Sequence, residues 1–150
     1  MELIYVILIS AMPIFELRAG IPIAIYYGFK PMEAYAIAIF GNFLPVPFLL
    51  IALSKFLLIL KNFKSIWQVY ETIEKRVDSK REIVEKYGYF GLALFVALPL
   101  PATGAWTGCL LAFLLGLNKL KASLAIFLGI LIAGVIVLLP IVGIINFINF

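Results

Sequence analysis

The stretch Pro99-Leu-Pro101-Ala-Thr-Gly104 lies in the middle of a segment, Tyr87–Leu117, that contains no charged residue. As one straight helix this segment would be about 46 Å long at 1.5 Å per residue. The hydrocarbon core of a bilayer is only about 30 Å thick. Because proline and glycine interrupt helices, the sequence predicts two half-length helices that enter the membrane and return to the same side. This arrangement is a re-entrant hairpin.

The composition of the whole chain agrees with a location in the bilayer. Of its 150 residues, 65% are hydrophobic and 13% are charged, which leaves a soluble domain too little polar surface to cover itself. Leu3–Phe29, Met32–Leu60 and Ala122–Phe150 are further long apolar segments. The chain begins Met-Glu without a basic region, so we expect the first segment to be retained rather than cleaved as a signal peptide. We therefore predict an all-α integral membrane protein.

Residue usage argues against several functional classes. One cysteine and no histidine give no internal disulfide and remove the commonest metal ligand and general base, so we expect no metal or other cofactor. The net charge of +4 comes mostly from a segment between the apolar blocks, where basic residues face lipid headgroups rather than nucleic acid. An enzyme is the least expected class, because the chain offers no paired carboxylates and no activated nucleophile.

The chain also contains an internal repeat. A shift of 88 residues, with no gap, superposes six identical residues: Pro13 on Pro101, Gly20 on Gly108, Ala24 on Ala112, Gly28 on Gly116, Ala34 on Ala122 and Gly41 on Gly129. Four of the six pairs are glycine or proline, which constrain the backbone directly. The pattern predicts a duplicated unit.

Each predicted unit is a re-entrant helical hairpin followed by one transmembrane helix. Repeat 1 (1–60) has its hairpin at about 3–29 and its transmembrane helix at about 32–60, and repeat 2 (88–150) has them at about 88–117 and 122–148. The linker at 61–87 has apolar residues at helical spacing among many charges, so we expect an amphipathic helix. That helix either lies on the inner leaflet or pairs with a second copy in a homodimer.

The distribution of Lys and Arg favours the hairpins over two extra membrane crossings. If both hairpins return to their own side, nine basic residues lie on the side of the linker and Lys30 alone lies opposite. If both blocks span, the division is seven against three. The positive-inside rule then places the linker in the cytoplasm and both termini outside. The two units would be inverted relative to each other, as in many secondary transporters.

Glu16 and Arg18 lie at the break of the first apolar block. A charge at the bilayer centre costs at least about 2.5–3.5 kcal/mol, so such residues face a protein interior or a wet cavity and usually have a function. One hypothesis is that Glu16 exchanges a proton or cation while Arg18 holds an anionic substrate group. The other is an ion pair that fixes the hairpin. Residues two apart do not face each other on a helix, so that pair requires a non-helical tip, which Gly20 and Pro22 favour.

The second break carries no charge, but Thr103, Trp106 and Thr107 supply hydroxyl and indole groups beside Gly104 and Gly108. Its exposed backbone amides could bind an anion or Arg18. Alternatively, the small residues only allow the two hairpins to pack closely.

Asn42, Pro45 and Pro47 lie within the second apolar block. The two prolines either unwind the helix opposite the first break or produce a plain kink. The candidate site comprises Glu16, Arg18, Pro22, Asn42, Pro45, Pro47, Pro99, Pro101, Thr103, Gly104, Trp106, Thr107 and Gly108.

The motifs ELRAGIP, GNFLPVPFLL and KYGYFGLALFVALPLPATGAWTG resemble the small multi-drug export protein family and, more distantly, the DedA superfamily. The resemblance implies opposed re-entrant hairpins, a transport-related role and a prokaryotic plasma membrane. DedA-like proteins are associated with lipid handling, although they often carry Arg at the second tip, where this chain has no charge. We therefore expect a transporter of an amphipathic small molecule or a lipid. The alternatives are an uncoupled lipid scramblase and a membrane assembly factor without transport activity.

Overall fold

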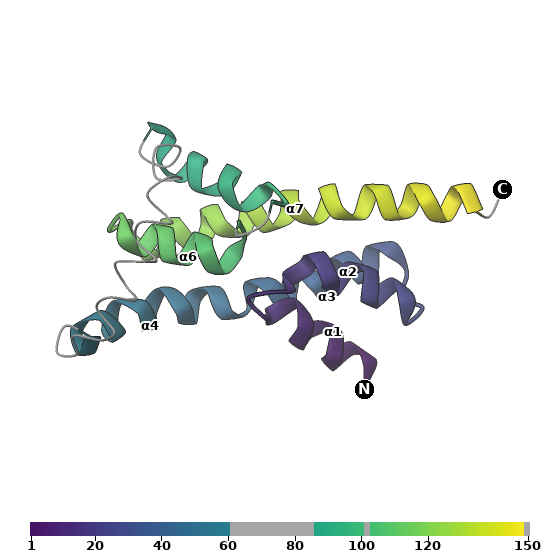
Figure 1. Cartoon of the computed structure of the whole chain (residues 1–150), viewed down its shortest axis with the longest axis horizontal. Coiled ribbons are helices and arrows are strands. Elements are labelled where there is room, and N and C mark those ends of the chain that lie inside the picture. The colour runs from purple at the N-terminus through teal and green to yellow at the C-terminus, as the bar shows by residue number, and fades with distance from the viewer. Residues whose placement is uncertain (61–85, 101–102, 149–150) are drawn as a thin grey trace.

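The computed structural model describes residues 1–60, 86–100 and 103–148, and in these ranges it contains helices and turns but no strand (Figure 1). Predicting an all-helical fold was therefore correct. The amphipathic helix predicted for 61–87 lies almost entirely outside the described residues. The elements are α1 (Glu2–Ala11), α2 (Glu16–Tyr26), α3 (Pro31–Phe43), α4 (Pro45–Leu60), a helix at 86–97, α6 (Ala105–Leu114) and α7 (Lys119–Ile148).

In the first half, the short helices α1 and α2 form a hairpin that precedes the long stretch α3–α4. Helix α1 ends before Pro13, because the residue that precedes a proline is driven out of the helical region, and Met12 is extended with ψ of 141°. Helix α2 begins at Glu16, so Gly20 and Pro22 lie inside it rather than in the tip. The tip is non-helical as expected, but only over the turn at 12–15, which includes Pro13 and excludes Gly20 and Pro22.

The two helices that follow the tips end in the same motif. After α2, Gly28 has φ of +89° and Phe29 N–H donates to Ala24 O at 3.1 Å. After α6, Gly116 has φ of +63° and Leu117 N–H donates to Ala112 O at 2.9 Å. Ala112 lies 88 residues after Ala24, the acceptor of the first turn. Both are Schellman turns, which require a left-handed residue and so favour glycine. These two equivalent hydrogen bonds are therefore separated by the same 88 residues as the identities in the sequence.

Close packing repeats with the same spacing. A Cβ added to Gly41 in α3 would come within 2.7 Å of Ile7 O in α1. A Cβ added to Gly129 in α7 would come within 2.6 Å of Ala93 O in the helix at 86–97. In both halves a glycine thus lets the long helix lie against the backbone of the first short helix.

The two long helical stretches run antiparallel, with α7 above α3 and α4 in the view of Figure 1. Tyr35 Oη, near the start of α3, donates to Leu131 O at 3.0 Å. At the end of α3, the Phe43 ring meets Phe127 edge-on with centroids 4.8 Å apart. From Tyr35 to Phe43 the residue number rises along α3, while the partner in α7 falls from Leu131 to Phe127. The two helices therefore run in opposite directions. The largest apolar core lies between these helices and the two hairpins.

Two stretches are long and apolar enough to cross a membrane. These are Pro31–Leu53, with mean hydropathy 2.2, and Lys119–Ile145, with mean hydropathy 3.0. Only a third of the most apolar window of each is buried, and large side chains such as Phe48 are exposed on the outer surface. Such a surface is suited to lipid rather than water. The fold is an all-helical membrane protein with two candidate spans.

The first of these spans is interrupted after Phe43. Leu44 keeps helical dihedral angles, φ −50° and ψ −46°, and α4 starts at Pro45. The prolines therefore give a one-residue break, closer to the plain kink than to an unwound segment. Helix α4 packs chiefly against α6 and α7.

Candidate functional site

Glu16 is buried at the tip of the first hairpin, with 6% of its surface exposed. Its φ of +50° lies in the left-handed region, which is unusual for a residue with a side chain and persists only where the surroundings enforce it. Its Oε1 accepts a hydrogen bond from Trp106 N–H at 3.4 Å. The carboxylate therefore occupies the N-terminus of α6, where the helix dipole and unpaired amides favour negative charge.

Gly104 provides the space for that carboxylate. Any Cβ on Gly104 would overlap both carboxylate oxygens of Glu16. Its φ of +151° with ψ of −171° is also a combination that essentially only glycine adopts. A side chain at this position would displace Glu16.

Arg18 is half-buried and binds the other end of the broken block. Its guanidinium donates to Leu100 O at 2.7 Å and to Leu98 O at 3.4 Å, which follow directly on the helix at 86–97. It also donates to the carbonyl and hydroxyl oxygens of Thr103, the latter at 3.1 Å. The C-terminal end of a helix leaves carbonyls unpaired and carries partial negative charge, which a guanidinium satisfies.

Thr103 organises the turn that Arg18 binds. Its hydroxyl is within hydrogen-bond distance of Leu100 O, at 2.8 Å, and of Leu98 O. It also accepts from Leu100 N–H at 3.2 Å. Because a hydroxyl has one proton, it donates to one of these carbonyls at a time. Both carbonyls also accept a backbone N–H, from Leu100 at 2.9 Å and from Thr103 at 3.2 Å, so Arg18 adds a charged donor to a turn that is already hydrogen-bonded.

Trp106 makes a third connection between the hairpins. Its indole Nε1–H donates to Ala11 O, the last carbonyl of α1, at 3.0 Å. The tips therefore interlock through side chains from both halves. Within the described residues no ion pair joins Glu16 to Arg18, and each binds the opposite hairpin instead of the other.

Asn42 is buried but does not join this cluster of contacts. Its Oδ1 has no hydrogen-bond partner among the described residues. Ser10 Oγ is likewise buried and unpaired within that part of the chain, and no sequence pattern singles this residue out. Pro45 and Pro47 lie in the first turn of α4, where Cys109 Sγ is 3.9 Å from Val46 O.

The remaining predicted residues have structural positions. Pro22 lies inside α2, Pro99 follows the helix at 86–97, and Pro101 lies outside the described residues. Thr107 lies in the first turn of α6. Gly108 packs against Val96, since a Cβ there would come within 2.6 Å of it. The site contacts that sequence reasoning missed are the backbone carbonyls of Ala11, Leu98 and Leu100. These residues stand at predicted helix ends, and this position was the feature of the sequence that could have identified their carbonyls as hydrogen-bond acceptors.

The geometry is thus a carboxylate and a guanidinium from one hairpin bound to the two helix ends of the other. Comparison with known proteins finds no curated protein and no solved structure that matches the chain. Residues 16–136, which begin at Glu16 and include both tips, match the family described as "Putative small multi-drug export protein", and the chain belongs to this family.

Proposed function

We propose that the chain is a small membrane transporter in which Glu16 and Arg18 form both the contact between two opposed hairpins and the site for substrate or coupling ion. The observation that carries the proposal is their cross-binding, because Glu16 contacts the N-terminus of α6 while Arg18 contacts the carbonyls at 98 and 100. The family description, which names small multi-drug export, supports this function.

The architecture we infer is an inverted repeat whose halves each contain a re-entrant hairpin and one transmembrane helix. Support comes from the 88-residue spacing of the Schellman turns and close-packed glycines, and from the antiparallel long helices. Helix α1 has 10 residues and α2 has 11, so they are about 15–16 Å long, half the depth of the hydrocarbon core. The bias of basic residues favours a cytoplasmic linker with both termini outside.

A transport cycle follows from the chemistry of the contact. A protonated Glu16 would lose its negative charge and its attraction to the positive end of α6. The hairpins could then separate, which would free Arg18 from its carbonyls to bind an anionic or polar group of the substrate. Because the surroundings are apolar, we infer an amphipathic small molecule or a lipid as substrate. A proton, or a cation that competes for Glu16, would provide the coupling.

A proteoliposome assay tests this function. Uptake of the fluorescent amphipathic anion 8-anilinonaphthalene-1-sulfonate, driven by a pH gradient, is measured for the wild type and for Glu16→Gln, which is isosteric but cannot ionise. Glu33→Gln is the matched control, because Glu33 is exposed and accepts a hydrogen bond only from Lys30 N–H, at 3.0 Å, outside the tip. We expect Glu16→Gln to lose gradient-driven uptake and Glu33→Gln to keep it.

The same vesicles distinguish the alternative functions when a fluorescent phospholipid is included. Lipid movement without a gradient, equal in wild type and Glu16→Gln, would identify an uncoupled scramblase and overturn coupling through Glu16. The absence of both activities in folded wild-type protein would favour the assembly role. Gradient-driven uptake by Glu16→Gln at the wild-type rate would refute the coupling function of this residue.

A further inference from the structure

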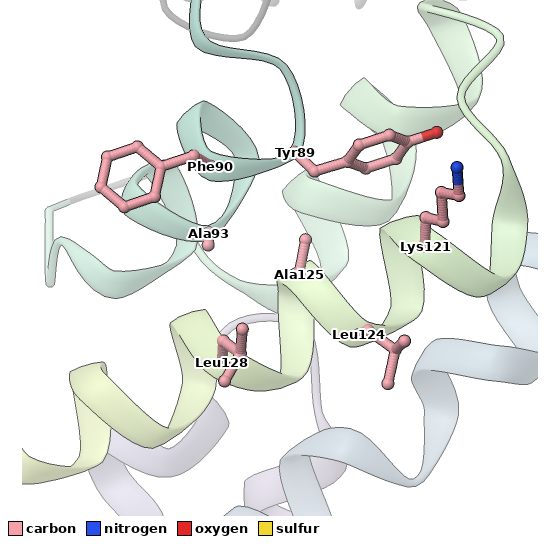
Figure 2. A pocket seen from close by; sticks show the side chains of 7 residues that line it. All are labelled: Tyr89, Phe90, Ala93, Lys121, Leu124, Ala125 and Leu128. Atoms are coloured by element: carbon pink, nitrogen blue, oxygen red, sulfur yellow. The ribbon is translucent and has the colours of Figure 1, made fainter.

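A groove of about 390 Å³ lies on the outer side of the second half, far along the chain from the Glu16 contact. Its two sides come from the helix at 86–97 and from the first turns of α7 (Figure 2). Ala93 and Ala125, both nearly fully buried, form its floor. Phe90, Leu124 and Leu128 form its rim and are 72%, 58% and 55% exposed, so the groove opens toward the surrounding lipid.

The polar groups of the groove lie together at one end. In Figure 2 the Tyr89 hydroxyl and the Lys121 amine point to the same side, while the rest of the lining is apolar. Tyr89 Oη accepts a hydrogen bond from Asn118 N–H at 3.1 Å, which leaves its own proton free to donate. No carboxylate of the described residues forms an ion pair with Lys121. This end therefore presents a cation and a hydroxyl donor.

The polar end and the apolar end of the groove lie at different depths in the membrane. The candidate span begins at Lys119, so Lys121 lies within its first turn, at headgroup level. Leu128 is seven residues further along α7, or about 10 Å deeper. The groove thus runs from the headgroup region, on the side we assign to the cytoplasm, into the acyl-chain region.

We propose that this groove binds an anionic glycerophospholipid, with the phosphate on Lys121 and the Tyr89 hydroxyl and one acyl chain on Ala93 and Ala125. The charge of Lys121 complements a phosphate with net negative charge, and the apolar lining complements the chain. A zwitterionic headgroup brings its own cation, which competes for the phosphate, so the anionic lipid is preferred. The site requires a membrane location but not the transport function proposed above.

The other half lacks the features that make this site. Residues 88 positions earlier than Ala93, Ala125 and Lys121 are Tyr5, Ile37 and Glu33. Two small floor residues are thus replaced by large ones, and the cation is replaced by an acid. The groove is therefore a property of this sequence in the second half and is not dictated by the shared arrangement of helices.

Native mass spectrometry of the full chain in detergent tests the proposal. The protein is incubated with an equimolar mixture of dioleoyl phosphatidylglycerol and dioleoyl phosphatidylcholine, and the ratio of the two bound lipids is measured. One Lys near an anionic headgroup corresponds to about a fivefold preference. We expect Lys121→Glu to remove this preference, whereas Lys119→Glu, a charge reversal two residues away and outside the groove lining, changes it less than about twofold.

Two Trp variants test the contact with the acyl chain. A competition experiment tests whether the groove binds a lipid rather than a free phosphate compound. Leu128→Trp places a large ring on the rim and should displace the bound lipid, whereas Ile132→Trp, one turn further on, should not. Excess glycerol 3-phosphate should fail to displace phosphatidylglycerol. Equal ratios for Lys121→Glu and Lys119→Glu, full lipid retention by Leu128→Trp, or displacement by glycerol 3-phosphate would each overturn the proposal. Because Glu16→Gln leaves the groove intact, it should retain the lipid even if transport is lost.

Discussion

The tips of the two hairpins are built in opposite ways. The first carries two charged side chains, Glu16 and Arg18, on a short turn between α1 and α2. The second carries no charge and instead offers backbone groups, with the carbonyls at 98 and 100 on one side and the first amides of α6 on the other. Each tip therefore supplies what the other lacks.

This difference shows how two opposite charges can be held within an apolar protein without pairing to each other. A broken helix presents partial positive charge at the new N-terminus and partial negative charge at the new C-terminus. The carboxylate and the guanidinium are each matched to one of these ends, and the unpaired backbone groups of the break are satisfied at the same time. The charges and the helix break are thus mutually dependent.

Among the variants that test this comparison between the tips, Gly104→Ala is expected to lower the free energy of unfolding most. The added Cβ would overlap the carboxylate of Glu16 and strain a backbone that only glycine adopts. We expect a loss of about 4 kcal/mol in the free energy of unfolding, from backbone strain and an uncompensated buried charge. Thermal unfolding in detergent measures it, with Gly143→Ala as control, because Gly143 lies in α7 with open space around its Cβ position. Equal destabilisation by both variants would contradict the role of Gly104.

Arg18→Met should have the next largest effect. It keeps an apolar stem of similar length but removes the charge-assisted hydrogen bonds to the carbonyls at 98 and 100, which then keep only backbone N–H and Thr103 hydroxyl donors, at a cost of about 3 kcal/mol. Arg18→Lys should fall between Met and the wild type, because an ammonium is a point charge and cannot reach several carbonyls as a planar fork does. Lys55→Met, at an exposed position on α4, controls for the loss of a cation. If Lys restores full stability at position 18, charge alone accounts for the contact.

The sequence was sufficient to predict an all-helical fold with helices long and apolar enough to cross a membrane. The apolar blocks Leu3–Phe29 and Tyr87–Leu117, together with Pro13 and the prolines near 100, predicted short helices before each long one. The 88-residue spacing paired Gly28 with Gly116, and the structure shows a left-handed turn at both positions, a conformation that restricts which residue can stand there. These features depend on local backbone chemistry, which individual residues encode.

The contacts within the site could not be predicted to the same degree. Arg18 binds carbonyls, and every residue has a carbonyl, so no residue type marks Leu98 or Leu100 as a partner. Gly20 and Pro22 were expected in the tip because both disfavour helices, but α2 includes them. In lipid a backbone group without a partner is more costly than a residue of low helix propensity. Tertiary packing of Gly20 against Ala38 adds to that preference.

Thr103→Val tests how far the second tip depends on the Thr103 hydroxyl. Valine has the same shape but cannot bond the carbonyls at 98 and 100, so we expect a loss of about 2 kcal/mol. Thr103→Ser keeps the hydroxyl and should lose much less. Unfolding temperatures of the two variants, measured in the same detergent, give the comparison. Equal values would mean that Arg18 alone holds the turn.

Trp106→Phe should have the smallest effect, because it removes one hydrogen bond and keeps most of the ring. The lost donor to Ala11 O corresponds to about 1 kcal/mol. A double-mutant cycle with Arg18→Met asks whether the connections act together. The two contacts lie on opposite ends of the broken helix, but both close the same interface between hairpins. If the hairpins separate as units, the second substitution should cost less in the Arg18→Met background than in the wild type, whereas strict additivity would mean that each contact opens independently.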